Sequence, residues 1–127
     1  MIASLRDLKV WQEAVALGAE VVRAGRRSAR RETKVVSDEV MTTALRVATA
    51  VAEGTGHHDP QGQHASYRAA RLALLRLETE LAISRQAGLI DEETVAALTR
   101  RAGAVAKLLG GYLVYLERQL GDEAARG

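Results

Sequence analysis

The 127-residue chain contains no cysteine and no phenylalanine, and only one tryptophan and one proline. Without cysteine, disulfide bonds and thiol catalysis are excluded, and the composition suits a reducing compartment. The scarcity of aromatic residues argues against a β-sandwich, whose strands favour aromatic and β-branched side chains. No long run alternates apolar with polar residues, so the sequence predicts an all-α protein.

The sequence also lacks long uninterrupted apolar runs. The N-terminal segment has no apolar core of the kind found in signal peptides. No window approaches the ~18 consecutive apolar residues of a membrane-spanning helix. We therefore expect a cytoplasmic protein with no membrane partner, and the length predicts a single domain over residues 1–127.

The stretch from Asp59 to Gly88 organises the rest of the chain. Asp59 suits a helix N-cap, Pro60 suits the first helical position, and Gly88 suits the left-handed position after a helix. These signals predict a helix over residues 60–87. Its spacings of three and four define one apolar face, for which we predict core positions. That face contains Tyr67, Ala70, Leu74, Leu77 and Leu81.

The same helix carries a second apolar set on roughly the opposite side, Ala65, Ala69, Leu72, Leu75 and Ile83. A helix that is apolar on two sides cannot bury both against one neighbour. Left in solvent, the second set would form an unusual surface patch. We therefore predict a homo-oligomer, with an interface that includes Leu72, Leu75 and Ile83.

Three further helices are predicted, over residues 7–24, 37–53 and 92–120. Their expected N-caps are Asp7, Ser37 and Asp91. Together with the central helix they predict an antiparallel up-down-up-down four-helix bundle. The predicted apolar stripe of the helix over residues 7–24 contains Leu8, Trp11, Val15, Gly18 and Val22. The stripe of the helix over residues 37–53 contains Val40, Ala44, Val47 and Val51. The stripe of the helix over residues 92–120 contains Val95, Leu98, Ala102, Val105, Leu109, Tyr112 and Leu116. Among these residues Trp11, Leu109 and Tyr112 are expected core anchors.

Positive charge is concentrated in the segment Arg23–Lys34, which has no apolar periodicity and should form a solvated connection or a frayed helix end. Its basic residues are Arg23, Arg26, Arg27, Arg30, Arg31 and Lys34, against the single acid Glu32. Arginine clusters bind nucleic-acid phosphates, so this segment is the candidate RNA or DNA site, to which His57 and His58 would add charge. A basic surface that only keeps an oligomeric scaffold in solution remains the alternative.

Nothing in the sequence indicates an enzyme, a metal or another cofactor. His57, His58 and His64 do not follow the spacing of a known metal site. Glu53, Glu78 and Glu80 could serve a metal in a bundle core, but the Glu-x-x-His motifs of di-iron bundles are missing. For Glu78 we expect a structural ion pair or a hydrogen bond between helices.

Four blocks of residues, in this order and at these spacings, resemble a known family. They are Leu5–Gln12 (LRDLKVWQ), Val51–Gly54 (VAEG), Leu77–Leu81 (LETEL) and Gly88–Ile90 (GLI). The chain resembles the bacterial four-helix-bundle family, also called the 23S rRNA intervening-sequence proteins. It is also similar to the accessory variability proteins of diversity-generating retroelements.

The resemblance implies an antiparallel four-helix bundle that assembles into a ring, typically a pentamer. The retroelement proteins are basic pentamers that bind a reverse transcriptase and nucleic acid, so these are the implied partners. This chain departs from the family pattern at four places, and two of them replace basic residues. Val40-Met41-Thr42 replaces a Leu-Arg-Arg segment, and His57-His58 replaces a basic pair.

Overall fold

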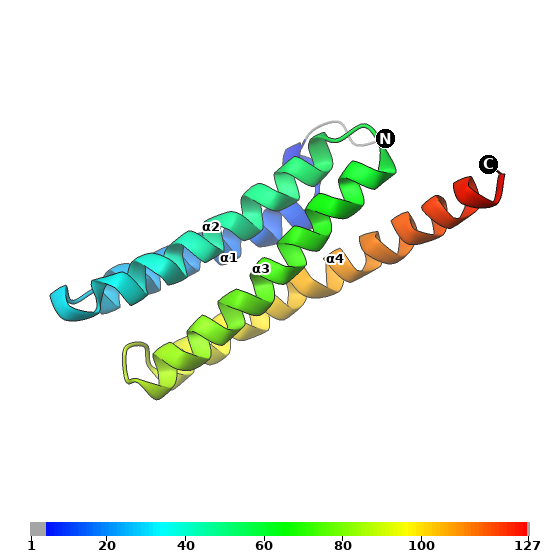
Figure 1. The fold of residues 1–127 in the computed structure, drawn as a ribbon. Coiled ribbons are helices and arrows are strands. Elements are labelled where there is room, and N and C mark those ends of the chain that lie inside the picture. Colours follow the sequence, from blue (N-terminus) through cyan, green and yellow to red (C-terminus); the bar gives the residue numbers. More distant parts are fainter. Residues whose placement is uncertain (1–4, 127) are drawn as a thin grey trace.

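The computed structural model describes residues 5–126 and contains four long helices with short connections (Figure 1). These are α1 (Lys9–Ser28), α2 (Lys34–Gly56), α3 (Pro60–Gln86) and α4 (Glu92–Arg126), with single 3-10 turns at Leu5–Asp7 and Arg31–Thr33. Successive helices run in opposite directions, and α1 packs against α4 as well as α2. The fold is therefore the predicted all-α, up-down-up-down arrangement.

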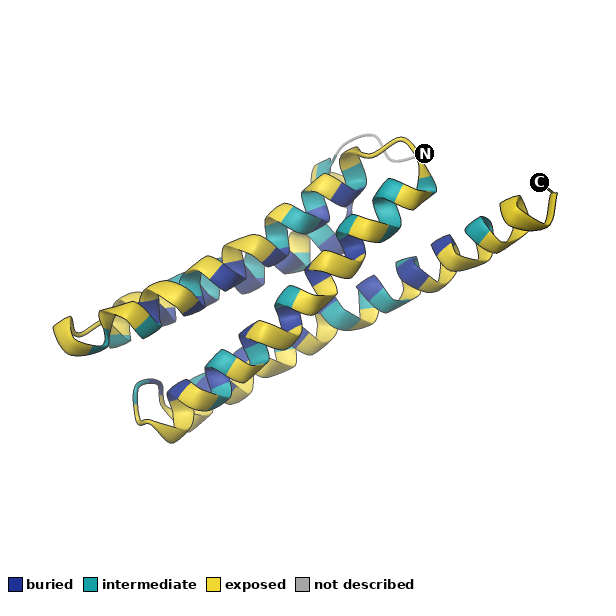
Figure 2. Ribbon diagram, viewed as in Figure 1, coloured by how far each residue is buried: buried dark blue, intermediate teal, exposed yellow. Residues whose placement is uncertain are grey.

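The core is a column of leucine, valine and alanine side chains contributed by all four helices (Figure 2). The predicted core face of α3 is buried along its whole length, including Leu74, Leu77 and Leu81. The predicted stripe of α2 is buried too, from Val40 to Val51. Leucine and valine make up most of these stripes, so the core is aliphatic and has few aromatic residues.

The ends of α3 and the start of α4 follow the sequence signals. The Asp59 carboxylate accepts a hydrogen bond from the Gly62 N–H at 2.9 Å, and Pro60 is the first residue of α3. Gly88 follows α3 with a φ of 77°, a conformation that glycine adopts without strain. Asp91 accepts hydrogen bonds from the Thr94 N–H at 3.1 Å and the Thr94 hydroxyl at 2.5 Å. The predicted caps of α3 and α4 are therefore confirmed.

The predicted starts of α1 and α2 are wrong. Asp7 lies in the 3-10 turn, and the buried Leu8 occupies the cap position of α1 without a side-chain cap. Helix α2 starts three residues before Ser37, which is buried inside it. The Lys34 ammonium lies 2.6 Å from the Asp38 carboxylate, an i,i+4 pair that stabilises this extra turn.

The apolar stripe of α1 is displaced from the predicted one by about one residue. The core takes Val10, Ala14, Leu17 and Val21, whereas Val15 stays 40% exposed. Trp11, predicted as a core anchor, is only partly buried and packs against the edge of the core. Two apolar stripes lie side by side on α1, so spacing alone did not identify the buried one.

In α4 the core passes through Leu113 in place of Tyr112, and Leu109 is fully buried. Tyr112 is partly buried, and its ring centroid lies 5.6 Å from that of Tyr67 in α3. The helix also continues beyond the predicted end at residue 120, because Gly121 does not interrupt it.

Gly54 is required by the packing of Tyr67. A Cβ atom at Gly54 would lie 2.6 Å from Cε1 of the Tyr67 ring, closer than real contacts allow. The ring has little room to move, because the Tyr67 hydroxyl is 3.1 Å from Oγ1 of Thr55 and the ring centroid is 5.6 Å from that of Tyr112. The glycine of the VAEG block therefore has a packing role between α2 and α3.

We predict that Gly54→Ala destabilises the protein by about 1–3 kcal/mol, the usual cost of forcing an extra methyl group into a packed site. Gly56→Ala, in the same helix end, is the control, because a Cβ there meets nothing within 4 Å. Urea unfolding followed by circular dichroism would measure both. Equal unfolding midpoints for the two variants would contradict the packing role.

Candidate nucleic-acid interface

The basic residues predicted to bind nucleic acid lie at the end of the bundle where α1 gives way to α2. The segment Arg23–Lys34 was predicted to be a solvated connection or a frayed helix end. Its first part is regular helix, because α1 continues to Ser28 and holds Arg23, Arg26 and Arg27 on its last turns. Gly25 does not end the helix, because it is buried against Met41 of α2. We call the six exposed residues here the arginine end: Arg23, Arg26, Arg27, Arg30, Arg31 and Lys34.

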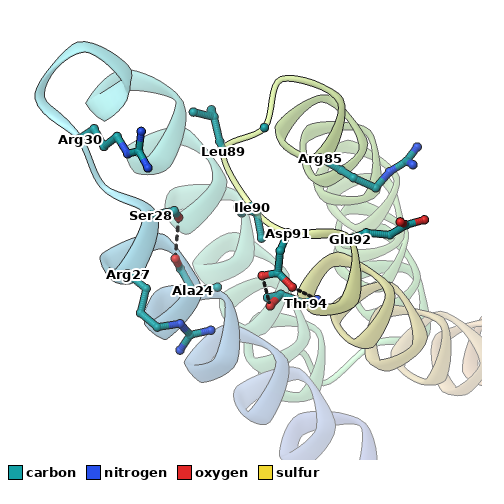
Figure 3. A pocket seen from close by; sticks show the side chains of 11 residues that line it. Ala24, Arg27, Ser28, Arg30, Arg85, Leu89, Ile90, Asp91, Glu92 and Thr94 are labelled. Carbon is teal, nitrogen blue, oxygen red and sulfur yellow. Dashed lines mark hydrogen bonds between the residues drawn. The ribbon is translucent and has the colours of Figure 1, made fainter.

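The arginine end adjoins a hollow of about 550 Å³ beside the turn from α3 to α4 (Figure 3). Arg27 and Arg30 line one side of it, whereas Arg85 and Glu92 point away on the other side. The remaining lining residues are Ala24, Ser28, Gly88, Leu89, Ile90, Asp91 and Thr94. This open, mixed-charge hollow suits contact with a flexible chain more than enclosure of a small molecule.

Acidic side chains at the start of α4 reduce the positive charge of the arginine end. Arg23 and Arg27 share a second hollow with Glu20 and Glu93. Hydrogen bonds from the Thr94 side chain and backbone lower the pKa of Asp91, and Arg27 contributes in the same direction. Asp91 is therefore ionised and negatively charged near Arg27. The field at this end is weaker than the arginine count suggests.

His57 and His58 lie far from the arginine end. They follow α2, and the 23 residues of that helix separate them from Lys34 by about 35 Å. Within one subunit these histidines and the arginines therefore do not lie on one local surface, and the contribution of the histidines to nucleic-acid binding stays a prediction. His64 has a different role, because its Nε2 lies 3.0 Å from the Glu117 carboxylate of α4. Within residues 5–126 no three potential ligand side chains of His, Cys, Asp or Glu gather as a metal site.

The second apolar face of α3 stays exposed in the subunit, as predicted. Leu72, Leu75 and Ile83 are each more than half exposed, and together with Ala65 and Ala69 they are called the α3 seam here. Shallow grooves flank the seam on both sides. Leu72 borders both of them, one shared with α2 and one shared with α4.

Glu80 has an unusual environment that the sequence interpretation missed. Its Oε1 is buried without a hydrogen-bond partner, and its Oε2 is 4.0 Å from Arg76. Burial raises the pKa of Glu80, and Glu39 acts in the same direction, although Thr43 and Arg76 oppose them. The available signal was its position, three residues after Leu77 and one before Leu81 on the core side of α3. Glu78, for which the sequence predicted an ion pair or a hydrogen bond between helices, is partly buried.

The antiparallel helices and their aliphatic core define an all-α four-helix-bundle protein. The family model of the 23S rRNA-intervening sequence protein matches residues 6–111, so the chain belongs to that family, as the four sequence blocks indicated. A search among curated proteins gave no significant match. Among the described residues, no helix has the length and apolarity needed to cross a membrane.

We predict that Glu80→Gln stabilises the protein at neutral pH by about 1 kcal/mol, because it removes a charge that burial disfavours. The native pKa of Glu80 lies above the ordinary value of 4.5, so the native state binds the proton more readily than the unfolded state. The difference in the free energy of unfolding between the variant and wild type should be largest at pH values above the raised pKa. It should shrink as the pH falls through that pKa toward about 4.5.

Thermal unfolding of wild type and variant between neutral and mildly acidic pH would measure this difference. Glu78→Gln is the control, since it removes the same charge two residues away on the same helix. A stability difference for Glu80→Gln that does not change with pH would contradict the burial of an ionised Glu80.

Proposed function

We propose that this protein is a non-enzymatic adaptor that assembles with copies of itself through the α3 seam and binds nucleic-acid phosphates through its arginine end. The observation that carries the proposal is the pairing of two surfaces on one rigid bundle. One surface is apolar and left uncovered by the subunit, and the other gathers five exposed arginines where α1 meets α2.

Assembly follows from the exposure of the α3 seam. Its leucines and isoleucine form a line of uncovered apolar surface along one helix, which is unusual for a monomer unless the surface has a partner. Membership of the family adds the expectation of a cyclic homo-oligomer, and the resemblance suggests five subunits. Closed symmetry would repeat the arginine end once per subunit.

The arginine end suits phosphate contacts without base specificity. Arg23, Arg26 and Arg27 are fixed on a helix, and Arg30 and Arg31 extend from the connection. Guanidinium groups match phosphate geometry and keep their charge at any physiological pH. With acids nearby we expect weak, sequence-tolerant binding of RNA or DNA, with a Kd of about 10⁻⁴–10⁻⁶ M at physiological salt. A reverse transcriptase is the protein partner that the resemblance to retroelement proteins suggests.

A second candidate function is a protein scaffold with no nucleic-acid ligand. Two observations favour it. Asp91 and Glu93 lie beside the arginines of α1 and offset their charge, and Lys34 is paired with Asp38. In that case the arginines would serve only to keep the assembly in solution.

We predict that replacing Arg26, Arg27, Arg30 and Arg31 with Ser weakens binding to a labelled single-stranded RNA and to duplex DNA, while leaving assembly intact. Fewer counterions are released when fewer phosphates are contacted, so the dependence of affinity on salt should also flatten. Fluorescence anisotropy at salt concentrations between about 50 and 200 mM would measure both effects.

The control is a variant of equal charge, with Arg6, Arg46, Arg118 and Arg126 replaced by Ser. All four are exposed and lie outside the arginine end. Retained binding in the control and lost binding in the test variant would support the site. Equal binding by the two variants, or no binding by wild type at about 50 mM salt, would leave the scaffold as the function.

A further inference from the structure

Helix α1 covers only the first half of α4. The Arg101 guanidinium of α4 lies 3.1 Å from Glu20 and 3.6 Å from Glu13, which fixes α1 alongside this part of α4. The two helices are antiparallel, and α1 begins at Lys9, only four residues before Glu13. Beyond this level α4 continues to Arg126, and its distal end runs past the rest of the bundle (Figure 1).

The uncovered part of α4 is apolar where α1 would otherwise lie. A hollow of about 600 Å³ there is lined by Lys107, Leu108, Gly111, Tyr112 and Tyr115. The Tyr115 side chain is 63% exposed, and Val114 beside it is 47% exposed. Leu108 and Tyr112 are partly buried against the core, and Tyr112 also meets Tyr67 of α3. Gly111, Val114 and Tyr115 stay exposed, and none of them borders the grooves beside the α3 seam.

We propose that this face of α4 binds the same face of a second copy, with the two α4 helices antiparallel and crossing at Gly111. The order of charges along the face selects this occupant and this direction. Arg100 lies eleven residues before Gly111 and Asp122 lies eleven residues after it, and both are exposed. In an antiparallel pair each Arg100 therefore faces Asp122 of the second copy, whereas a parallel pair would place like charges together.

The residues nearer the crossing are matched in the same way. Lys107 and Tyr115 each lie four residues from Gly111, so an ammonium group meets an aromatic ring twice, a favourable cation–π arrangement. Leu108 and Val114 each lie three residues from it, which sets apolar against apolar. At 100° per residue the charged and aromatic members of these pairs lie within about 40° of Gly111 on the helix surface.

Gly111 itself fits the crossing point. A Cβ atom there would meet no other part of the described chain within 4 Å, so packing inside the subunit does not require a glycine. Glycine in the middle of a helix is less favourable than alanine. A second backbone at that point gives the residue a function, since the missing side chain lets two helices approach closely.

Cross-linking tests the proposal directly, because the chain has no native cysteine. A Gly111→Cys variant should form a disulfide with its own copy under mild oxidation, since a disulfide needs Cα atoms about 4.4–6.8 Å apart. The control is Gly103→Cys, an equally open glycine of the same helix that lies off the proposed contact line. Both are made in a Leu72→Asp, Leu75→Asp background, so that assembly through the α3 seam cannot bring the cysteines together.

A covalent dimer from Gly111→Cys and none from Gly103→Cys supports the two-fold contact. No dimer from Gly111→Cys, or equal dimers from both variants, overturns it. The background also separates this proposal from the proposed function, because loss of the α4 contact would leave the α3 seam and nucleic-acid binding unaffected.

A charge exchange checks the same contact without a new cross-link. Arg100→Asp should weaken dimerisation in the same background at least about tenfold, because it sets two like-charge pairs across the interface. Adding Asp122→Arg should restore the dimer, since both pairs become attractive again. Failure of the second substitution to rescue the first, measured by analytical ultracentrifugation, would overturn the antiparallel register.

Discussion

The packing of α3 against two helices at once is the interaction on which the rest of the structure depends. Its buried face, from Tyr67 to Leu81, contributes to the core between α2 and α4, while Gly54 makes room for the Tyr67 ring at the α2 contact. Because that face is buried in the core, the leucines on the opposite side of α3 have no partner inside the subunit. The same helix therefore stabilises the bundle and leaves the surface through which we propose that copies assemble.

The positions of the two candidate surfaces follow from where the helices end. Helix α1 ends at Ser28, so its last turns carry arginines to the end of the bundle, beside the acidic start of α4. At the other end, α1 begins too late to cover the distal half of α4, and Tyr115 and Val114 of α4 stay exposed. The positions at which α1 begins and ends thus determine which surfaces of the bundle stay uncovered.

Much of the fold could be predicted because its signals are local. The caps of α3 at Asp59 and Gly88 depend on neighbouring residues, and the core stripe of α3 depends on a single apolar spacing. The buried face of α1 could not be predicted in the same way. Trp11 and Val10 belong to two adjacent apolar stripes, and only packing against α2 and α4 determines which stripe is buried.

The candidate site was predictable only in part. The charge of the arginine end is visible in the sequence, but the nearby acids come from α4, about sixty residues later in the chain. The separation of His57 and His58 from that end follows from the length of α2, and the helix predicted over residues 37–53 already lay between the two sets of residues. The buried, partly unpaired carboxylate of Glu80 was hidden in the sequence, because its surroundings include Glu39 and Thr43 of α2.

The central claim of this account is that the α3 seam is covered by another copy of the chain. Multi-angle light scattering at micromolar concentration measures it most directly, by comparing wild type with a Leu72→Asp, Leu75→Asp variant. The account predicts an oligomer mass for wild type and a smaller assembly for the variant, with circular dichroism showing equal helicity. A monomer mass for wild type, or the same mass for both proteins, would contradict it.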